Sequence, residues 1–253
     1  MPGSCHAAAE PARRAVPPAG ANGHTVQDAQ GATLYFQPVA DLPLTLPTEP
    51  AAALLGALDR ERKIDRALEA FGPVADRDVA VIGGGPAEIA RLAAAGARVR
   101  ELPVAGDEWR ATDASADLIV SAWSAFRGVT AGELAEGDRV LRPDGRLVVI
   151  HDYGRDDVSR LRGDLPEYGI WSRRDGPFIR NGFRIRVLHC FWTFDSMEEA
   201  RRFLDQAFGE AGAALAAGLK RPRLSYNVAV YHRTRGGRAT AANAHTEGST
   251  SRS

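Results

Sequence analysis

The chain is poor in cysteine and lysine and has no long apolar run, and each shortage excludes a class of protein. Only Cys5 and Cys190 occur among 253 residues, so neither a disulfide framework nor a cysteine metal site is expected. The histidines are scattered without paired spacing, which also argues against a metal. No apolar run approaches the roughly 20 residues of a membrane span. The N-terminus lacks the basic and apolar regions of a signal peptide. These absences predict a cytoplasmic protein without a membrane partner.

Neither sign of charge dominates the chain. The 32 basic residues balance the 32 acidic ones, and the formal net charge is zero. No overall field therefore draws the protein to nucleic acid. A hydrophobic content of 44% and a charged content of 25% are ordinary for a globular protein. The length accommodates one α/β domain with a sizeable core rather than two full domains.

Composition divides the chain into three parts. Residues 1–47 are rich in alanine, proline and glycine, and are predicted to be disordered or loosely draped. Residues 48–235 carry the apolar periodicity of a folded α/β domain. Residues 236–253 are predicted to be a disordered tail. Apolar residues at helical spacing predict a helix that starts at Thr48 and continues to Phe71.

Within the middle part, apolar β-branched runs alternate with helical segments. This alternation predicts a Rossmann-like, doubly wound and mostly parallel sheet. The last two strands flank a helix and are expected to form an antiparallel pair at one edge. Strands are expected at 78–83, 97–103, 117–122, 146–151, 184–193 and 225–232, and helices at 86–95, 130–141 and 196–217.

The most informative stretch is residues 78–90, in which a β-branched run enters Gly83, Gly84 and Gly85 and leaves through a helical segment. Glycine is needed where a strand-to-helix turn adopts backbone angles that a Cβ would obstruct, or where a ligand approaches the main chain. The N–H groups at the start of the helix favour anionic ligand groups. The stretch therefore predicts the first βαβ unit of a nucleotide-type fold.

Two further stretches follow in order. Residues 116–123 form an Asp-Leu-Ile-Val strand, and residues 138–150 run through Arg-Val-Leu-Arg into a Pro-Asp-Gly turn and a buried strand. Together the three stretches resemble the class I S-adenosylmethionine-dependent methyltransferases over about residues 75–233. The resemblance implies a methyltransferase-type fold, S-adenosylmethionine as cofactor and a small-molecule acceptor. It places residues 83–85 under the methionine part of the cofactor, Glu101 at the ribose and Asp107 at the adenine edge.

The candidate catalytic groups are His151, Asp152 and Tyr153, at the end of the predicted strand 146–151. The carboxyl ends of parallel strands face the ligand crevice of an open α/β sheet. A histidine titrating near pH 6.5 suits proton abstraction at neutral pH, which a methyl acceptor needs only if it must lose a proton. Alternatively, His151 and Asp152 could cap the next segment through local hydrogen bonds.

Three other features border the predicted site. Trp123 and Arg127 follow the predicted strand 117–122 and could form an aromatic and cationic wall, although a tryptophan is more often part of a core. The segment 155–182 is long enough to form a lid, but its many arginines could also be a solvated surface with mixed ion pairs.

Two other functions stay open. Val81 and Pro103 stand where the family commonly has acidic residues, and the stretch from Pro103 to Asp117 is too short for a helix and a strand. These departures favour a non-catalytic methyltransferase-fold protein with a binding or regulatory role. Residues 81–87 are also close to a flavoprotein fingerprint, which favours a flavin or nicotinamide oxidoreductase, but Glu88 replaces its last glycine. The sequence identifies neither the methyl acceptor nor the oligomeric state.

Overall fold

The computed structural model divides the chain into two compact units, residues 1–38 and 39–253. In the first unit, β1 (Thr25–Gln27) pairs with β2 (Thr33–Tyr35) in antiparallel fashion. The predicted boundaries at residues 47/48 and 235/236 remain predictions. The structure describes residues 25–27, 33–35, 42–83, 85–105 and 108–236.

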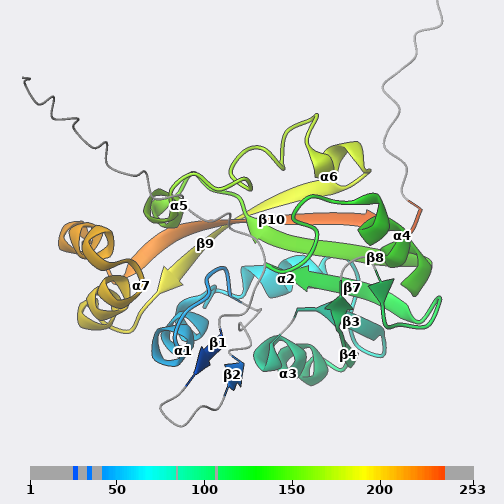
Figure 1. Ribbon diagram of the computed structural model, residues 1–253, viewed down its shortest axis with the longest axis horizontal. Helices are drawn as coiled ribbons and strands as arrows, with labels where there is room; N and C mark the ends of the chain where they lie inside the picture. The colour runs from blue at the N-terminus through cyan, green and yellow to red at the C-terminus, as the bar shows by residue number, and fades with distance from the viewer. Residues whose placement is uncertain (1–24, 28–32, 36–41, 84, 106–107, 237–253) are drawn as a thin grey trace, which may run out of the picture. The chain divides into compact units, whose positions relative to one another are not determined.

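A six-stranded sheet organises the second unit, in the order β4-β3-β7-β8-β10-β9 (Figure 1). The strands β4, β3, β7 and β8 are parallel, whereas β10 is antiparallel to both β8 and β9. The predicted α/β fold, with a mostly parallel sheet and an antiparallel edge pair, is therefore confirmed. The strands are β3 (Asp78–Ile82), β4 (Arg98–Leu102), β7 (Ala116–Ala122), β8 (Leu141–Asp152), β9 (Arg184–Thr193) and β10 (Arg223–Thr234).

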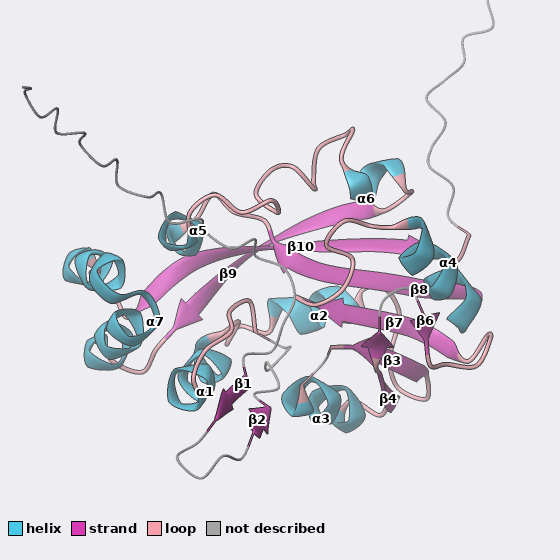
Figure 2. Cartoon of the chain, viewed as in Figure 1, coloured by secondary structure: helices cyan, strands magenta, loops and turns pink. Residues whose placement is uncertain are grey.

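Helices cover both faces of this sheet (Figure 2). One face packs against α1, α2, α3 and α7, and the other against α4 and α6. Alternate strand residues supply the two cores, as the period-two geometry of a strand requires. Val79 and Val81 face one side, for example, while Ala80 and Ile82 face the other. The helices are α1 (Thr48–Ala57), α2 (Lys63–Glu69), α3 (Pro86–Ala94), α4 (Ala131–Val140), α5 (Asp157–Arg162), α6 (Pro177–Arg180) and α7 (Met197–Gly218).

The helix predicted to run from Thr48 to Phe71 is instead two helices, α1 and α2. Leu58 is extended, and Asp59 and Arg62 both have positive φ, at +50° and +55°. The Asp59 carboxylate accepts hydrogen bonds from the backbone N–H groups of Lys63, at 3.0 Å, and Ile64, at 2.7 Å. Apolar spacing continues across the break, but this side chain satisfies the free donors of a new helix start.

The stretch between β4 and β7 is short, as the sequence indicates. It holds β5 (Val104–Ala105) and β6 (Glu108–Trp109), which pair only with each other. The described residues thus contain no further strand on the outer side of β4, and β4 is one edge of the sheet.

Candidate functional site

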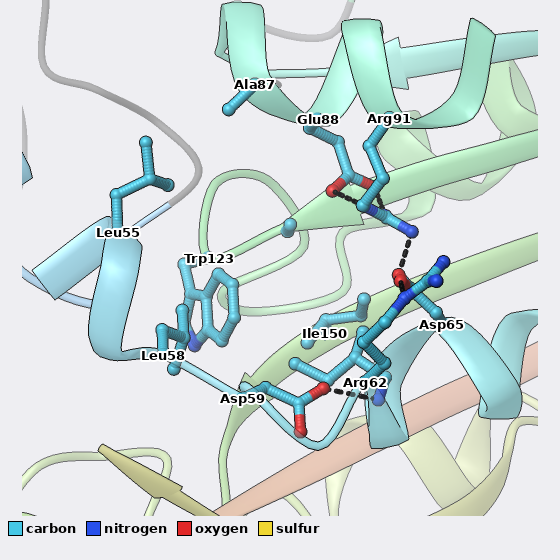
Figure 3. A pocket seen from close by; sticks show the side chains of 12 residues that line it. Leu55, Leu58, Asp59, Arg62, Asp65, Ala87, Glu88, Arg91, Trp123 and Ile150 are labelled. Atoms are coloured by element: carbon cyan, nitrogen blue, oxygen red, sulfur yellow. Dashed lines mark hydrogen bonds and ion pairs between the residues drawn. The ribbon is translucent and has the colours of Figure 1, made fainter. Parts of the chain in front are cut away.

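A cavity opens near the carboxyl ends of β7 and β8, beside the first turns of α3. Its volume of about 310 Å³ is at the lower end of the roughly 300–1,000 Å³ typical of ligand sites. Figure 3 shows α3 on one side of it and α1, α2 and the turn between them on the other. It is lined by Leu55, Leu58, Asp59, Arg62, Ile64, Asp65, Ala87, Glu88, Arg91, Ala122, Trp123 and Ile150.

A chain of ion pairs crosses one wall of the cavity (Figure 3). Arg91 on α3 binds Glu88 one turn earlier, with Nη2 2.5 Å from Oε1, and also reaches Asp65 on α2. Asp65 in turn accepts a hydrogen bond from Arg62 Nε at 2.9 Å. Asp65 is nearly buried, so its charge depends on these two guanidinium groups. With Asp59, the wall presents three carboxylates and two guanidinium groups to a ligand.

Trp123 forms the aromatic wall of the cavity, next to Leu58 and Ile150 (Figure 3). Its backbone φ is +50°, a region that a bulky residue adopts only at a cost. Its N–H donates to Ile150 O at 2.8 Å, and its indole Nε1 donates to Asp152 Oδ1 at 3.1 Å. Tyr226 stacks on the indole, with ring centroids 6.5 Å apart. The side chain is therefore fixed from three directions.

Asp152 lies at the end of β8 and is the centre of a buried polar cluster. Besides the indole of Trp123, its carboxylate accepts hydrogen bonds from Tyr226 Oη and Arg162 Nη1. Burial raises the pKa of Asp152, while the charge of Arg162 and the hydroxyl of Tyr226 act in the opposite direction. Asp152, predicted as a catalytic base, thus accepts three hydrogen bonds. It fixes the side chain of Trp123 and does not itself line the cavity.

His151 points to the opposite face of the sheet from Ile150, into the second core. It is 1% exposed, and Trp171 and Phe178 pack on its ring at 4.8 and 6.2 Å between centroids. Its Nε2 contacts Ala125 O at 3.1 Å, whereas Nδ1 has no partner among the described residues. Burial and the nearby charge of Arg127 lower the pKa of His151 to about 3. At neutral pH the imidazole is therefore uncharged.

The structure disperses the other predicted site residues. Tyr153 is half-buried, with the Arg155 guanidinium 5.9 Å from its ring centroid. Gly83 has a φ of +63°, which a Cβ would strain, and Gly85 precedes α3 as its N-cap. Glu101 is an exposed residue of β4 and is not part of the cavity lining. The two remaining predicted positions, Gly84 and Asp107, lie outside the described residues.

The segment 155–182 contacts both cores, and its part around Trp171 and Phe178 lies on the side of His151. Glu167, which is buried, forms an ion pair with Arg127 in the loop after β7. Trp171 packs against the His151 ring. The lid predicted for this segment remains a prediction. Trp171 and Phe178 pack in the second core, whereas Val158 and Leu161 of α5 pack in the first, and none of the segment's residues lines the cavity beside Trp123.

Sequence reasoning missed the charged residues of the cavity wall. Asp65 and Arg91 are 26 positions apart in the chain, so their pairing depends on how α2 packs beside α3. The only local signal was Asp59, a residue type that often accepts hydrogen bonds at helix starts, although it lies three residues before Arg62, the N-cap of α2.

No protein-family model matches the chain, and no curated protein matches it either. Solved structures that match it over most of its length include a SAM-dependent methyltransferase from Aquifex aeolicus. It is 17% identical over 74% of this chain and 98% of its own, with a TM-score of 0.42. Another is geranyl diphosphate C-methyltransferase from Streptomyces coelicolor A3(2), solved with Mg²⁺, geranyl diphosphate and S-adenosyl-L-homocysteine. It is 13% identical, covering 69% of this chain and 78% of its own, with a TM-score of 0.36.

These low sequence identities and TM-scores say nothing about the reaction of this chain. The class of the fold is assigned instead from the order of the strands in the sheet. A parallel sheet that begins with the glycine turn and ends in an antiparallel pair around α7 is the arrangement that the motif resemblance implies. The chain is therefore a protein of the class I methyltransferase fold. None of its described helices is long and apolar enough to cross a membrane. No group of metal-binding side chains occurs in the described part of the chain.

The residues around the cavity fit one end of S-adenosylmethionine. Its aminoacyl group carries an ammonium and a carboxylate, and the wall supplies both complementary charges through Glu88, Asp65 and Arg91. The turn at Gly83 and the N-terminus of α3 allow close approach of a polar group. Glu101, the acid predicted to bind the ribose of the cofactor, does not line this cavity. The fit is thus to the methionine part of the cofactor.

Proposed function

We propose that the chain is an S-adenosylmethionine-dependent methyltransferase acting on a small molecule. The observation that carries this proposal is the position of the cavity, near the carboxyl ends of the parallel strands β7 and β8 and beside the first turns of α3. Ligands of open α/β sheets bind at this edge. Arg91, Glu88 and Asp65 would hold the aminoacyl end of the cofactor.

The cofactor, when bound, supplies an activated methyl group on a sulfonium sulfur. Transfer of such a group depends mainly on alignment and on a dry pocket. Trp123, Leu58 and Ile150 form the apolar wall that would exclude water and fix the approach of the acceptor. Because His151 and Asp152 are buried and engaged elsewhere, the proposal assigns them no proton transfer.

Calorimetric titration with S-adenosylhomocysteine tests the proposal. We expect saturable binding, and we expect the substitution Ala87→Trp, on the cavity side of α3, to weaken it at least tenfold. Ala93→Trp is the matched control, since Ala93 is exposed on the same helix, and should retain wild-type affinity. Absence of binding to the folded wild-type chain at millimolar ligand would overturn the proposal.

A second candidate is a non-catalytic protein of this fold that binds a ligand in the same cavity. Two observations favour it. Glu101 lies outside the cavity lining, and the carboxylates inside are already engaged by Arg62, Arg91 and the start of α2. Binding of S-adenosylhomocysteine without methyl transfer to any member of a broad acceptor panel would favour this candidate. Methyl transfer that Ala87→Trp abolishes would rule it out.

A further inference from the structure

Four basic side chains converge on one face of the antiparallel part of the sheet. Arg146 comes from β8, His232 from β10, and Arg184 and Arg186 from β9. His232 pairs directly with Arg184 across the β9–β10 ladder, and Val230 pairs with Arg186. Residues opposite each other in an antiparallel pair point to the same face. We call these four residues, together with Phe71 beside them, the arginine patch.

The contacts inside the arginine patch fix Arg146. Its Nη1 lies 3.3 Å from Nδ1 of His232, and its guanidinium carbon lies 5.1 Å from the centroid of the Phe71 ring. Phe71, which follows α2, also packs on the His232 ring at 4.3 Å between centroids. A neutral histidine nitrogen can accept a hydrogen bond from arginine. The imidazole therefore orients one guanidinium of the patch.

The positive charge of the arginine patch has no protein counter-charge among the described residues. Three arginines of the sheet strands have carboxylate partners, namely Arg98, Arg142 and Arg233. None of the ion pairs among the described residues involves Arg146, Arg184 or Arg186. None involves Glu69 or Asp144 either, the acids nearest in sequence to Phe71 and Arg146. Burial, and then the charges of these three arginines, lower the pKa of His232 to about 4. Like charges held together without a partner are unfavourable, and an anion relieves the repulsion.

We propose that the arginine patch is a second ligand site, separate from the cavity beside α3, and that it binds a phosphate group of a small molecule. Guanidinium groups match the oxygens of phosphate in geometry and charge. Three guanidinium groups from β8 and β9, on the same face as the imidazole of His232 on the intervening β10, suit one compact anion. This site does not depend on the methyltransferase activity proposed above.

Two features favour a small ligand over a nucleic acid. The chain has a formal net charge of zero, so no extended field accompanies the patch. The Phe71 ring is contacted by His232 and Arg146, which leaves it less accessible as a platform for stacking bases.

Arginines on an edge strand also discourage pairing with other chains, and β9 is such a strand. Edge protection requires positive charge on β9 alone. It gives no role to Arg146, which comes from β8 on the inner side of β10. Substitution of Arg146 therefore separates the two explanations.

The experiment titrates the full chain with inorganic phosphate and pyrophosphate at constant ionic strength, and follows heat and the imidazole resonances of His232. We expect saturable binding that moves the titration of His232 to higher pH, because a bound anion offsets the arginines. The variants R146Q and R184Q/R186Q should each weaken binding about tenfold or more. The control R201Q/R202Q, on exposed positions of α7, should bind as the wild type does.

Three results would overturn the proposal. The first is the absence of saturable binding to the folded chain. The second is unchanged affinity in R146Q, which would leave edge protection as the role of the arginines on β9. The third is tighter binding of a single-stranded oligonucleotide than of pyrophosphate, which would identify a polynucleotide site instead. Circular dichroism of each variant establishes that it has folded.

Discussion

Asp152 holds Trp123 in the cavity wall through a hydrogen bond of 3.1 Å from the indole Nε1 to Oδ1. The same carboxylate binds Arg162 and Tyr226, and its side chain is only 4% exposed. Asp152, at the carboxyl end of β8, thus affects the cavity through the side chain of Trp123. Asp152 is a positioning residue, and Trp123 is the side chain that a ligand would touch.

Substitutions of Asp152 and of Trp123 should differ in their effect on the free energy of unfolding. Asp152→Ala leaves the Arg162 charge, whose side chain is 14% exposed, without its partner, and we expect a loss of about 3–5 kcal/mol in the free energy of unfolding. Trp123→Phe removes one donor of three and should cost only about 1 kcal/mol. Urea denaturation at neutral pH measures both values. Similar losses in the two variants would contradict the central position of Asp152.

His151 should make the protein less stable in mild acid. Its pKa is about 3 in the folded chain and near 6.5 in the unfolded chain. Between these values the unfolded state binds the extra proton, so stability falls as the pH decreases from about 6.5 towards 3. At about pH 5 this group alone contributes a loss of about 2 kcal/mol. His151→Gln should lose that part of the pH dependence in denaturation curves. An imidazole of His151 that titrates near its ordinary value by NMR would refute the prediction.

Arg91 should be needed for cofactor affinity, if the proposed function holds. Arg91→Gln removes the guanidinium between Asp65 and Glu88 and should weaken binding of S-adenosylhomocysteine about tenfold. Arg98→Gln is the control, because Arg98 forms an exposed ion pair with Asp78 away from the cavity. Equal affinities in Arg91→Gln and the wild type would mean that Arg91 only ties α2 to α3.

Two glycines of α7 should respond in opposite ways to alanine. The helix is interrupted at Gly209, with φ of +55° and ψ of −134°, and this kink brings Gly212 against the backbone of Leu204. A Cβ at Gly212 would overlap the Leu204 carbonyl oxygen, so Gly212→Ala should cost about 3 kcal/mol. Gly218 has open space around its Cβ position and is exposed, so Gly218→Ala should be neutral or stabilising. Thermal unfolding of both variants checks the contrast.

The sequence predicts those elements that depend on local pattern. The strand at residues 184–193 has the expected bounds, and α3 and α7 differ from the predicted helices by single residues at their ends. The apolar periodicity of these segments agrees with their burial, so the sequence pattern and the tertiary packing favour the same secondary structure.

The break between α1 and α2 could not be predicted in this way. It depends on the Asp59 carboxylate and on contacts with β9, far along the chain. The ion pairs of the cavity wall could not be predicted either, since Asp65 contacts Arg91 only when α2 and α3 pack together. His151 was predicted to face a ligand because it lies at the carboxyl end of a parallel strand, but the alternation of strand residues turns it into the core opposite to that of Ile150.

The turn between α1 and α2 is attached to β9: Leu58 forms a bridge with Trp192, and the N–H of Asp59 donates to Phe191 O at 3.1 Å. These two turn residues also line the cavity. During synthesis, the glycine turn and the parallel strands leave the ribosome before β9 does. A nascent chain that ends before residue 191 therefore lacks the strand that holds this wall, and its cavity is incomplete. Leu58 and Asp59 belong to the N-terminal third of the chain, but the wall that they form is thus completed only after β9 has been made.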